Sequence, residues 1–249
     1  MALARDVCGL IPVYNNRMTL ERVVNGLLQH LDRVVVIDDG SSDGTAEIAD
    51  RLAAEQPQRV HVRHHAVNRG KGAAVQTGLA LAESLGCSHA LQVDADGQHD
   101  IADIPRFLEV MQSAPDSMVM GAPVFGDDIP AVRKYGRKLT KLMVALEAGT
   151  LKMPDAMCGF RLYPVTPVRR LGRLSSRMCF DPEVMIRAHW AGIPVTTIPT
   201  RVRYLSAEEG GVSHFRMFHD NLLNVWLHTR LLLQAPFRWV LRGMKSRAS

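Results

Sequence analysis

Residues 89–99 read His-Ala-Leu-Gln-Val-Asp-Ala-Asp-Gly-Gln-His, a short apolar run followed at once by two acids and a glycine. The run His89–Val93 is typical of a buried strand, and the polar turn marks its carboxyl end. Three earlier runs, 7–13, 33–37 and 60–64, also end in polar clusters. These clusters read Tyr14-Asn15, Asp38-Asp39-Gly-Ser-Ser-Asp43-Gly-Thr45 and Asn68-Arg69-Gly70-Lys71-Gly72. Since parallel strands bring their carboxyl ends to one edge of a sheet, we expect the four clusters to meet there.

Helical patterns separate these strands. Amphipathic spacing predicts helices over 19–31, 73–84 and 101–111, and a helix capped by Asp43 that runs through Leu52. A further strand is expected at 117–120. Strands that alternate with helices of this length predict one α/β domain with a mostly parallel, Rossmann-like sheet flanked by helices. In the second half the pattern predicts a mobile loop over 122–133, helices over 134–146 and 180–191, and an extended segment over 194–202.

Composition and charge narrow the class of protein. Hydrophobic residues make up 47% of the 249 residues and charged residues 22%, which excludes a disordered, coiled-coil or collagen-like chain. The formal charge of +5 comes from residues 214–249, where six Lys or Arg stand against one acid. The longest uncharged stretch, 188–200, contains two prolines and falls short of the roughly 20 apolar residues that cross a bilayer. No secretory signal or Cys-x-x-Cys pair is apparent, so we expect a soluble or peripheral protein of the cytoplasm.

Asp94 and Asp96 stand two residues apart at a strand end, so one turn can direct both carboxylates into the same crevice. Hard divalent cations bind such oxygens and complete their shell with substrate phosphates and water. Gln98 or His99 could supply a further ligand. A solvated Asp-Gly turn is the alternative, but the neighbouring clusters favour a metal site.

Two other clusters suit the parts of a nucleotide. Asp38 and Asp39 follow a strand, where a carboxylate can accept hydrogen bonds from a ribose or a nucleobase. The alternative is a helix N-terminal turn, because Ser41, Ser42 and Asp43 all cap well. Gly70-Lys71-Gly72 opens a helix whose free N–H groups favour a phosphate, although a purely structural glycine turn is equally compatible. The P-loop, the nucleophile elbow and zinc-binding spacings are all absent from the sequence.

In this order, Ile11-Pro-Val-Tyr-Asn, Asp38-Asp-Gly-Ser-Ser-Asp-Gly-Thr, Asn68-x-Gly-Lys-Gly and Asp94-Ala-Asp-Gly-Gln-His resemble the family 2 glycosyltransferases. The resemblance covers residues 7–213 and is strongest to the dolichyl- and polyprenyl-phosphate sugar synthases. It implies a GT-A fold, a nucleotide-sugar donor, a divalent cation (Mg²⁺ or Mn²⁺) and inversion at the anomeric carbon. It also implies a role for each cluster: Pro12, Tyr14 and Asn15 border the nucleotide, Asp39 meets its uridine or guanosine part, and Asp94 and Asp96, with Gln98 near them, hold the cation against the diphosphate.

Later segments resemble the same family. Asp155-x-x-x-Gly159-Phe160-Arg161 is similar to a segment that lines the acceptor side, which implicates Arg161. Arg203-Tyr204 and Gly211-Val-Ser213-His214 are similar to a loop whose cation and amides close over the phosphates. The chain departs from the branch at Gly121-Ala122-Pro123, where Gly-Ser-Arg is frequent, and Arg133 could replace the lost cation. The Gln-x-x-Arg-Trp motif of processive synthases is absent, which predicts single additions.

A catalytic base depends on the acceptor. In Phe180-Asp181-Pro-Glu183, either acid could deprotonate a hydroxyl acceptor. A phosphate acceptor is already an anion and needs no base. Asp181 could equally well cap a helix.

The basic C-terminal residues predict a separate element. Apolar residues at helical spacing form one stripe between arginines, and Pro236 should kink or divide the helix; the stripe is Phe215, Phe218, Leu222, Val225, Trp226 and Leu233. We expect residues 1–213 to form the catalytic domain and 214–249 a basic amphipathic helical tail on an anionic membrane surface. The alternative is a helix that packs this stripe onto the domain. Sparse aromatic residues argue against a nucleic-acid partner.

The leading interpretation is an inverting, metal-dependent, non-processive glycosyltransferase, peripheral on the cytoplasmic membrane. It would move a sugar from a nucleotide-sugar donor to a lipid-linked acceptor, such as a polyprenyl phosphate, in glycolipid or cell-envelope glycan synthesis. A sugar-phosphate nucleotidyltransferase needs a basic glycine-rich loop after the first strand, which Tyr14-Asn15-Asn16 does not supply. A non-catalytic nucleotide- or lipid-binding module with the same fold remains a second alternative.

Overall fold

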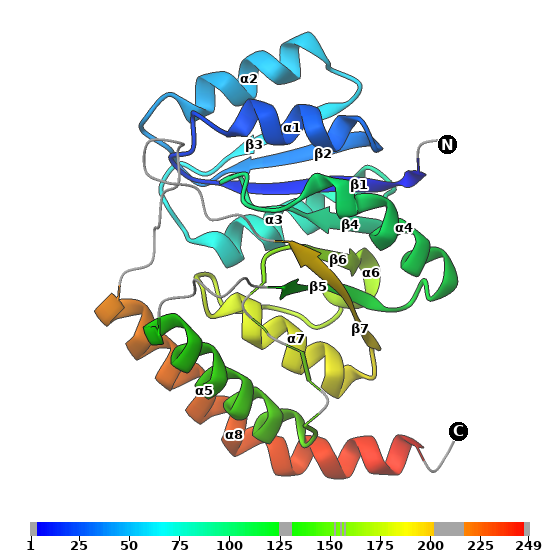
Figure 1. Cartoon of the computed structure of the whole chain (residues 1–249), viewed down its shortest axis with the longest axis vertical. Coiled ribbons are helices and arrows are strands. Elements are labelled where there is room, and N and C mark those ends of the chain that lie inside the picture. Colours follow the sequence, from blue (N-terminus) through cyan, green and yellow to red (C-terminus); the bar gives the residue numbers. More distant parts are fainter. Residues whose placement is uncertain are drawn as a thin grey trace.

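A seven-stranded sheet forms the centre of the described part of the chain (Figure 1). The computed structural model describes residues 4–124, 131–151, 153, 154, 156, 158–201 and 217–246. The strand order is β3-β2-β1-β4-β6-β5-β7. Only β6 is antiparallel to its neighbours. The strands are β1 (Ala4–Val13), β2 (Leu31–Asp38), β3 (Val60–His64), β4 (His89–Gln92), β5 (Met118–Val124), β6 (Arg161–Pro164) and β7 (Val195–Arg201).

Helices cover both faces of the sheet, and two more form an outer layer. One apolar cluster joins the sheet to α1 (Leu20–Leu28), α2 (Thr45–Glu55) and α4 (Ile104–Ser113), which follows the short 3-10 helix Ile101–Asp103. The other cluster joins the opposite face to α3 (Lys71–Ser84), α6 (Val165–Arg169) and α7 (Phe180–Ala191). The outer helices α5 (Ala131–Ala148) and α8 (Met217–Ser246) lie side by side in Figure 1 and contact each other and α7.

The alternation of side chains along β1 explains the two clusters. Leu10 belongs to the cluster with α3, whereas the next residue, Ile11, belongs to the cluster with α1. Both side chains are fully buried, as expected for a central strand with helices on both faces. The predicted α/β class with a mostly parallel sheet is therefore confirmed.

Most predicted elements are confirmed, and the differences have local causes. The helix predicted over 19–31 ends at Leu28, because Leu31 already pairs with β1. Asp43 does not occupy the N-cap position, which is Gly44, but its carboxylate accepts the Thr45 N–H at 3.0 Å and so still stabilises the start of α2.

The largest departures lie in the second half of the chain. The loop predicted over 122–133 is partly regular, since β5 continues to Val124 along β7 and α5 begins at Ala131. Residues 125–130 lie outside the described part. The short strand β6 and helix α6 were not predicted, because four residues of strand carry too little periodicity. Pro236 does not divide α8, but Figure 1 shows that the helix bends along its length, as expected where a proline removes a backbone donor.

Candidate active site

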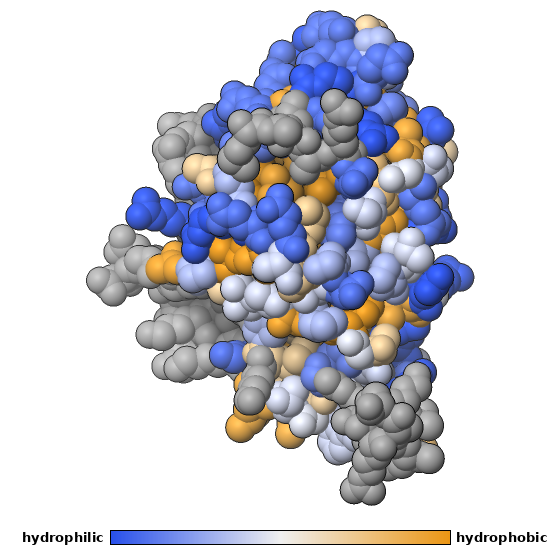
Figure 2. Space-filling view, turned by 90° about the vertical axis from the view of Figure 1, so that its right-hand side faces the viewer, coloured by the Kyte–Doolittle hydropathy of each residue, from blue (hydrophilic) through white to orange (hydrophobic). Residues whose placement is uncertain are grey.

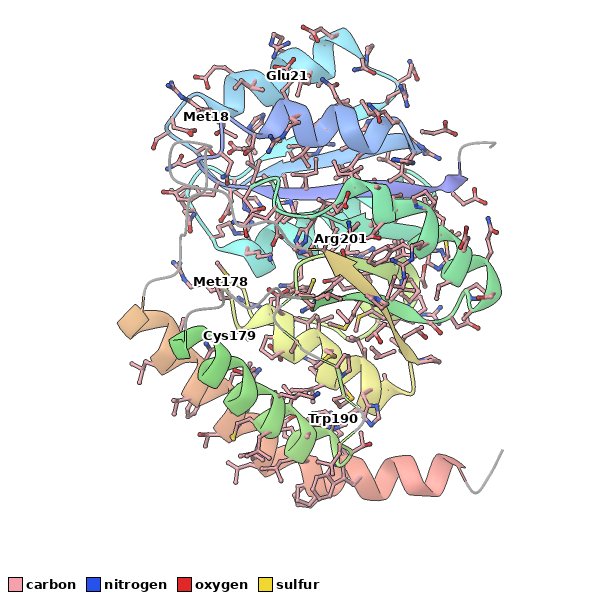
Figure 3. All side chains as sticks on the ribbon, in the orientation of Figure 1. Met18, Glu21, Met178, Cys179, Trp190 and Arg201 are labelled. Carbon is pink, nitrogen blue, oxygen red and sulfur yellow. The ribbon has the colours of Figure 1, made fainter. Side chains whose placement is uncertain are left out.

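The predicted polar clusters do meet at one edge of the sheet. In the strand order, β1 lies between β2 on one side and β4 on the other, so the carboxyl ends of these strands form a topological switch point, where open α/β sheets bind ligands. Asn15, Asp39 and Asp94 follow these three strands, and Lys71 opens α3 beside them. The first turn of α7 adds Asp181 from the second half of the chain. Figure 3 labels Met178 and Cys179 at this end of α7.

Lys71 joins two carboxylates at the centre of the site. Its Nζ atom lies 2.9 Å from both oxygens of Asp94 and 3.4 Å from Asp181 Oδ2. The Lys71 side chain is 17% exposed and that of Asp94 25%. Burial alone would lower the pKa of Lys71, but the carboxylates of Asp181 and Asp94 outweigh it and raise this pKa. Burial would conversely raise the pKa of Asp94, and Lys71 and His99 hold it well below its usual value. The pair is therefore ionised.

The glycines beside Lys71 have a structural reason. Gly70 has φ +96°, which favours glycine, and a Cβ at Gly72 would collide with the carbonyl oxygen of Ser175. The start of α3 thus packs directly on the segment before α7. Gly159 is as restricted, because a Cβ there would collide with the Asp94 carboxylate. The glycine-turn interpretation of Gly70-Lys71-Gly72 is correct for the glycines, while Lys71 itself belongs to the site.

Asp96 is held in the turn that follows β4. Its Oδ1 accepts the Gln98 N–H at 3.0 Å, and Gly97 has φ +70°. Burial and the nearby Asp94 charge raise the pKa of Asp96. Two carboxylates that disfavour each other's charge are an arrangement that a divalent cation would stabilise.

The donor set fits a cation that shares its shell with substrate. No group of three or more His, Cys, Asp or Glu suited to a metal occurs among the described residues. Asp94 and Asp96 would therefore supply two carboxylate ligands, and phosphate and water oxygens the rest, as is usual for Mg²⁺. His99 lies close, with Nε2 3.8 Å from Asp94 Oδ2, and its buried Nδ1 has no hydrogen-bond partner. Gln98 is half-buried beside them.

Behind Asp94, a buried polar chain that sequence reasoning missed orients the carboxylate. The Tyr163 hydroxyl donates to Gln92 Oε1 at 2.9 Å, and Gln92 Nε2 donates to Asp94 Oδ1 at 3.2 Å. Burial raises the pKa of Tyr163, so the hydroxyl keeps its proton and fixes the orientation of the Gln92 amide. The available signal was Gln92 itself, a polar residue inside an otherwise apolar strand.

The two acids at the end of β2, Asp38 and Asp39, are buried and hydrogen-bonded within the protein. Asp38 accepts Ser41 N–H at 3.1 Å and lies 3.0 Å from His64 Nδ1. Asp39 Oδ1 accepts from His65 Nδ1 at 2.6 Å and from Arg69 N–H at 2.9 Å. Its Oδ2 accepts Gly70 N–H at 2.7 Å. Asp39 thus holds the loop that leads into Lys71, and its contact with a nucleoside stays a prediction.

The residues after β1 connect two loops of the site. Asn15, with φ +51°, donates its N–H to Ser41 Oγ at 2.9 Å and accepts Ser42 N–H at 2.8 Å. Pro12 is buried in β1 and Tyr14 is half-buried. The hydrogen bonds of Asn15 hold it at the carboxyl edge of the sheet, and the contacts of Pro12, Tyr14 and Asn15 with a nucleotide stay a prediction.

Arg161 requires a correction. Its side chain is fully buried in β6, and its guanidinium donates to the carbonyl oxygens of Ala156, Cys158 and Asp181. It also lies 3.5 Å from Asp181 Oδ1. All of these donors point into the protein, so Arg161 has no surface for an acceptor. Arg161 instead positions Asp181 and the segment just before β6, which contains Ala156 and Cys158.

The two acids of α7 separate into different roles. The N-cap of α7 is Cys179, so the interpretation of Asp181 as a helix cap is wrong. Asp181 faces Lys71 and Arg161, whereas Glu183 faces away from this cluster. Glu183 accepts the Ser175 N–H and hydroxyl at 2.8 and 2.5 Å and pairs with Arg230 at 2.7 Å. Of the two, only Asp181 is placed beside the site.

Several predicted residues lie where the structure does not describe them. Arg133 falls in α5, but its side chain is outside the described part, and Asp155 is outside it as well. Arg203 and Ser213 fall in the segment 202–216, which is not described. Figure 3 labels Arg201, the last residue of β7 and the point where the chain enters that segment.

A mostly parallel sheet with paired carboxylates and a largely buried lysine at its switch point is an arrangement that fits the GT-A class of fold. The chain belongs to glycosyl transferase family 2, whose family model matches residues 9–172. Polyprenol monophosphomannose synthase of Mycolicibacterium smegmatis is 29% identical over 252 residues, covering 96% of this chain and 88% of that protein. Undecaprenyl-phosphate mannosyltransferase of Micrococcus luteus is 32% identical over 181 residues, covering 72% and 71%.

Solved structures agree on the fold. Glucosyl-3-phosphoglycerate synthase from Mycobacterium tuberculosis, in complex with Mn²⁺, uridine diphosphate and glucosyl-3-phosphoglycerate, superposes with a TM-score of 0.65. The match covers 94% of this chain and 80% of that one at 16% sequence identity, so it shows the fold alone. The predicted GT-A fold and the predicted family are confirmed. The chain is a glycosyltransferase, so the nucleotidyltransferase and the non-catalytic module are set aside.

Proposed function

We propose that this glycosyltransferase moves one sugar from a nucleotide-sugar donor to a polyprenyl-phosphate type acceptor, with a divalent cation and with inversion, in glycolipid or cell-envelope glycan synthesis. The observation that carries the proposal is the Asp94–Lys71–Asp181 cluster, with Asp96 beside it, at the carboxyl edge of the sheet. The acceptor class is supported by the names of relatives that match most of the chain. Inversion and single additions are what the family resemblance implies.

The residues present divide the work of transfer between them. A cation on Asp94 and Asp96 would neutralise the negative charge that the departing diphosphate gains. Lys71 is the protein's own cation within reach of the same phosphates, and the N-terminus of α3 adds a favourable dipole. Because a phosphate acceptor is already an anion, Asp181 is not required as a base and instead anchors Lys71 and Arg161.

Transfer to a polyprenyl phosphate is the first expected result. Purified protein with Mn²⁺ or Mg²⁺, a short-chain polyprenyl phosphate and a panel of labelled UDP- and GDP-sugars should give one lipid-linked monosaccharide from one donor. Mass spectrometry of the lipid product and NMR of its anomeric centre report the acceptor and the stereochemistry. Transfer only to a water-soluble acceptor, or addition of several sugars, would contradict the proposal.

We further propose that α8 holds the protein on an anionic membrane surface. Within the helices the structure describes, none is long and apolar enough to cross a bilayer. One face of α8 packs into the core through Leu227, Leu231 and Ala235. Arg230, which pairs with Glu183, and His228, 2.7 Å from Glu147, fasten the helix to α7 and α5. The helix is thus a fixed part of the fold, and the predicted boundary at 213/214 lies outside the described residues.

The described part of the predicted apolar stripe is exposed on the opposite face of α8 and comprises Leu222, Val225, Trp226 and Leu233. Phe215 and the side chain of Phe218 lie outside the described part. Trp226, Leu233 and Phe237 are 66%, 72% and 75% exposed. With Arg230 and Arg238 they line a shallow, mostly apolar groove of about 330 Å³. Figure 2 shows mostly hydrophilic residues at the top of the molecule, around α1 and α2, and a few hydrophobic residues among others at its lower end. Apolar rings beside arginines fit the boundary between acyl chains and anionic headgroups.

Vesicle binding tests this surface. The triple variant Trp226→Ser, Leu233→Ser, Phe237→Ser should sediment with phosphatidylcholine/phosphatidylglycerol vesicles at least about tenfold more weakly, because each side chain contributes about 1.5–3 kcal/mol when fully buried. High salt should also weaken the binding of the wild-type protein to these anionic vesicles, because salt screens the attraction of the arginines to the headgroups. Thermal stability should be unchanged, since the three side chains are exposed.

Met18→Ser provides a matched control. Met18 is 67% exposed and lies far from α8 in Figure 3, so its loss should leave vesicle binding unchanged. Equal vesicle binding by the wild type and the triple variant would contradict the membrane proposal. So would a wild-type dimer that the triple variant converts to a monomer without loss of vesicle binding.

A further inference from the structure

Lys71 occupies the carboxylate that a cation would need. Its ammonium contacts both oxygens of Asp94 at 2.9 Å, and Gln92 donates to one of them. A divalent cation binds a carboxylate oxygen directly at about 2.1 Å. The ammonium cannot keep both contacts while a cation takes either oxygen, because the two positive groups would then be adjacent in a largely buried site.

The structure offers Lys71 an alternative partner. Asp181 Oδ2 lies 3.4 Å from Nζ, so a small rotation of the side chain carries the ammonium from one acid toward the other. The backbone cannot follow, because Gly70 and Gly72 pack against residues 175–177 without room for a Cβ. Asp181 is itself already paired with Arg161, which weakens its hold on a second cation. An incoming diphosphate would be a stronger partner.

We propose that Lys71 is an internal counter-ion that couples cation binding to diphosphate binding. It competes with the cation for Asp94, and it releases Asp94 when the diphosphate of the donor accepts the ammonium. This inference rests on the metal site of the proposed function and adds to it a reason why cation and donor bind together. By linkage, the cation must then strengthen diphosphate binding by the same factor as the diphosphate strengthens cation binding.

The proposal predicts opposite changes in two affinities when Lys71 loses its charge. Mn²⁺ binding is measured by the EPR signal of free Mn²⁺, with protein alone and with saturating UDP or GDP, after correction for protein-free titrations. Without nucleotide, Lys71→Met and Lys71→Gln should bind Mn²⁺ about tenfold more tightly than the wild type, within the usual range of coupling between sites. Without metal, the same variants should bind UDP or GDP about tenfold more weakly.

Two controls keep the outcomes distinct. Lys71→Arg keeps the charge, so its Mn²⁺ affinity should stay within about threefold of the wild type, and Lys141→Met removes an exposed lysine of α5 and should change nothing. Lys71→Gln, which is uncharged but polar, carries the test if Lys71→Met does not fold. General damage to the site would weaken the binding of both Mn²⁺ and nucleotide. Loss of a competing ammonium would instead strengthen the binding of Mn²⁺ alone.

The result that overturns the inference is Mn²⁺ binding by Lys71→Gln that is no tighter than in the wild type. Its failure differs from failure of the proposed metal site. If Asp96→Asn leaves Mn²⁺ binding of the protein unchanged, the metal site itself is wrong. If Asp96→Asn removes Mn²⁺ binding and Lys71→Gln does not strengthen it, only the coupling is wrong.

Discussion

Replacement of Asp96 by asparagine should lower kcat about a hundredfold to a thousandfold and leave the fold intact. The substitution keeps the size of the side chain and the acceptor for the Gln98 N–H, but it removes the negative charge. A cation at Asp94 and Asp96 is expected to stabilise the departing diphosphate, and loss of one such electrostatic group commonly costs about 10²–10³ in rate. Initial rates at saturating donor and Mn²⁺ measure the effect.

Stability should move in the opposite direction. The pKa of Asp96 is raised in the folded protein by burial and by Asp94. The ionised carboxylate therefore works against folding above that pKa, and the neutral amide removes this unfavourable contribution. We expect the Tm of Asp96→Asn at neutral pH to equal or exceed that of the wild type in metal-free buffer. Loss of activity with unchanged or higher Tm would separate a functional role from a structural one.

Asp116→Asn is the matched control, because Asp116 is an exposed acid in the turn between α4 and β5. Its kcat and Tm should match those of the wild type. Wild-type turnover by Asp96→Asn, with metal present in excess, would show that the acid pair of the turn does not serve the reaction.

The part of the fold that the sequence predicts well is the part whose signal is local. The runs 7–13 and 33–37 are strands because β-branched residues fill a sheet buried on both faces. The edge strand 60–64, whose last two residues are exposed, and the helix Phe180–Ala191 also form as predicted. Strand β6 escapes prediction because Arg161-Leu-Tyr-Pro gains its structure only from the edges of β4 and β5. Its first residue, Arg161, even argues against a buried strand until its partners are known.

The active site divides in the same way, into residues that the sequence predicts and contacts that it does not. Asp94, Asp96, Asp39 and Lys71 could be proposed from the sequence, because each follows a strand or opens a helix at the predicted edge. The contacts between these side chains could not be proposed from the sequence. That Lys71 bridges Asp94 and Asp181 depends on how the start of α3 packs on the segment before α7, across about a hundred residues of sequence. Periodicity carries no information on contacts of that range.

Helix α8 has two apolar faces, of which the sequence pattern indicates one. The sequence predicts an apolar stripe on this helix and leaves two alternatives for it, contact with a membrane or packing on the catalytic domain. The structure shows a second apolar row, Leu227, Leu231 and Ala235, packed on the domain, while the described residues of the first row are exposed. A helix that is apolar on two sides can pack on the domain with one face and leave the other free for the membrane contact that we propose. Arg230, which lies between the two rows, pairs with Glu183 and also lines the groove beside the exposed row.

Arg161→Leu should lower the free energy of unfolding by about 3–5 kcal/mol, the usual loss when one partner of a buried ion pair is removed. Arg161 is fully buried, and its guanidinium serves the carbonyl oxygens of Ala156, Cys158 and Asp181. Without it, these oxygens lose their donors and the Asp181 carboxylate loses a cation. For a domain of this size the loss corresponds to a fall in Tm of about 10 °C, which thermal unfolding by circular dichroism can measure.

Arg161→Lys distinguishes this structural role from the acceptor contact that the sequence predicted. A single ammonium cannot reach three carbonyl oxygens that lie along a planar fork, so the lysine variant should also lose several degrees of Tm. Arg106→Leu, on the exposed side of α4, should lose less than about 1 kcal/mol because surface ion pairs contribute little. If Arg161→Lys instead kept the wild-type Tm and raised only the KM for the lipid acceptor, Arg161 would face the acceptor. The internal hydrogen bonds assigned to it would then be wrong.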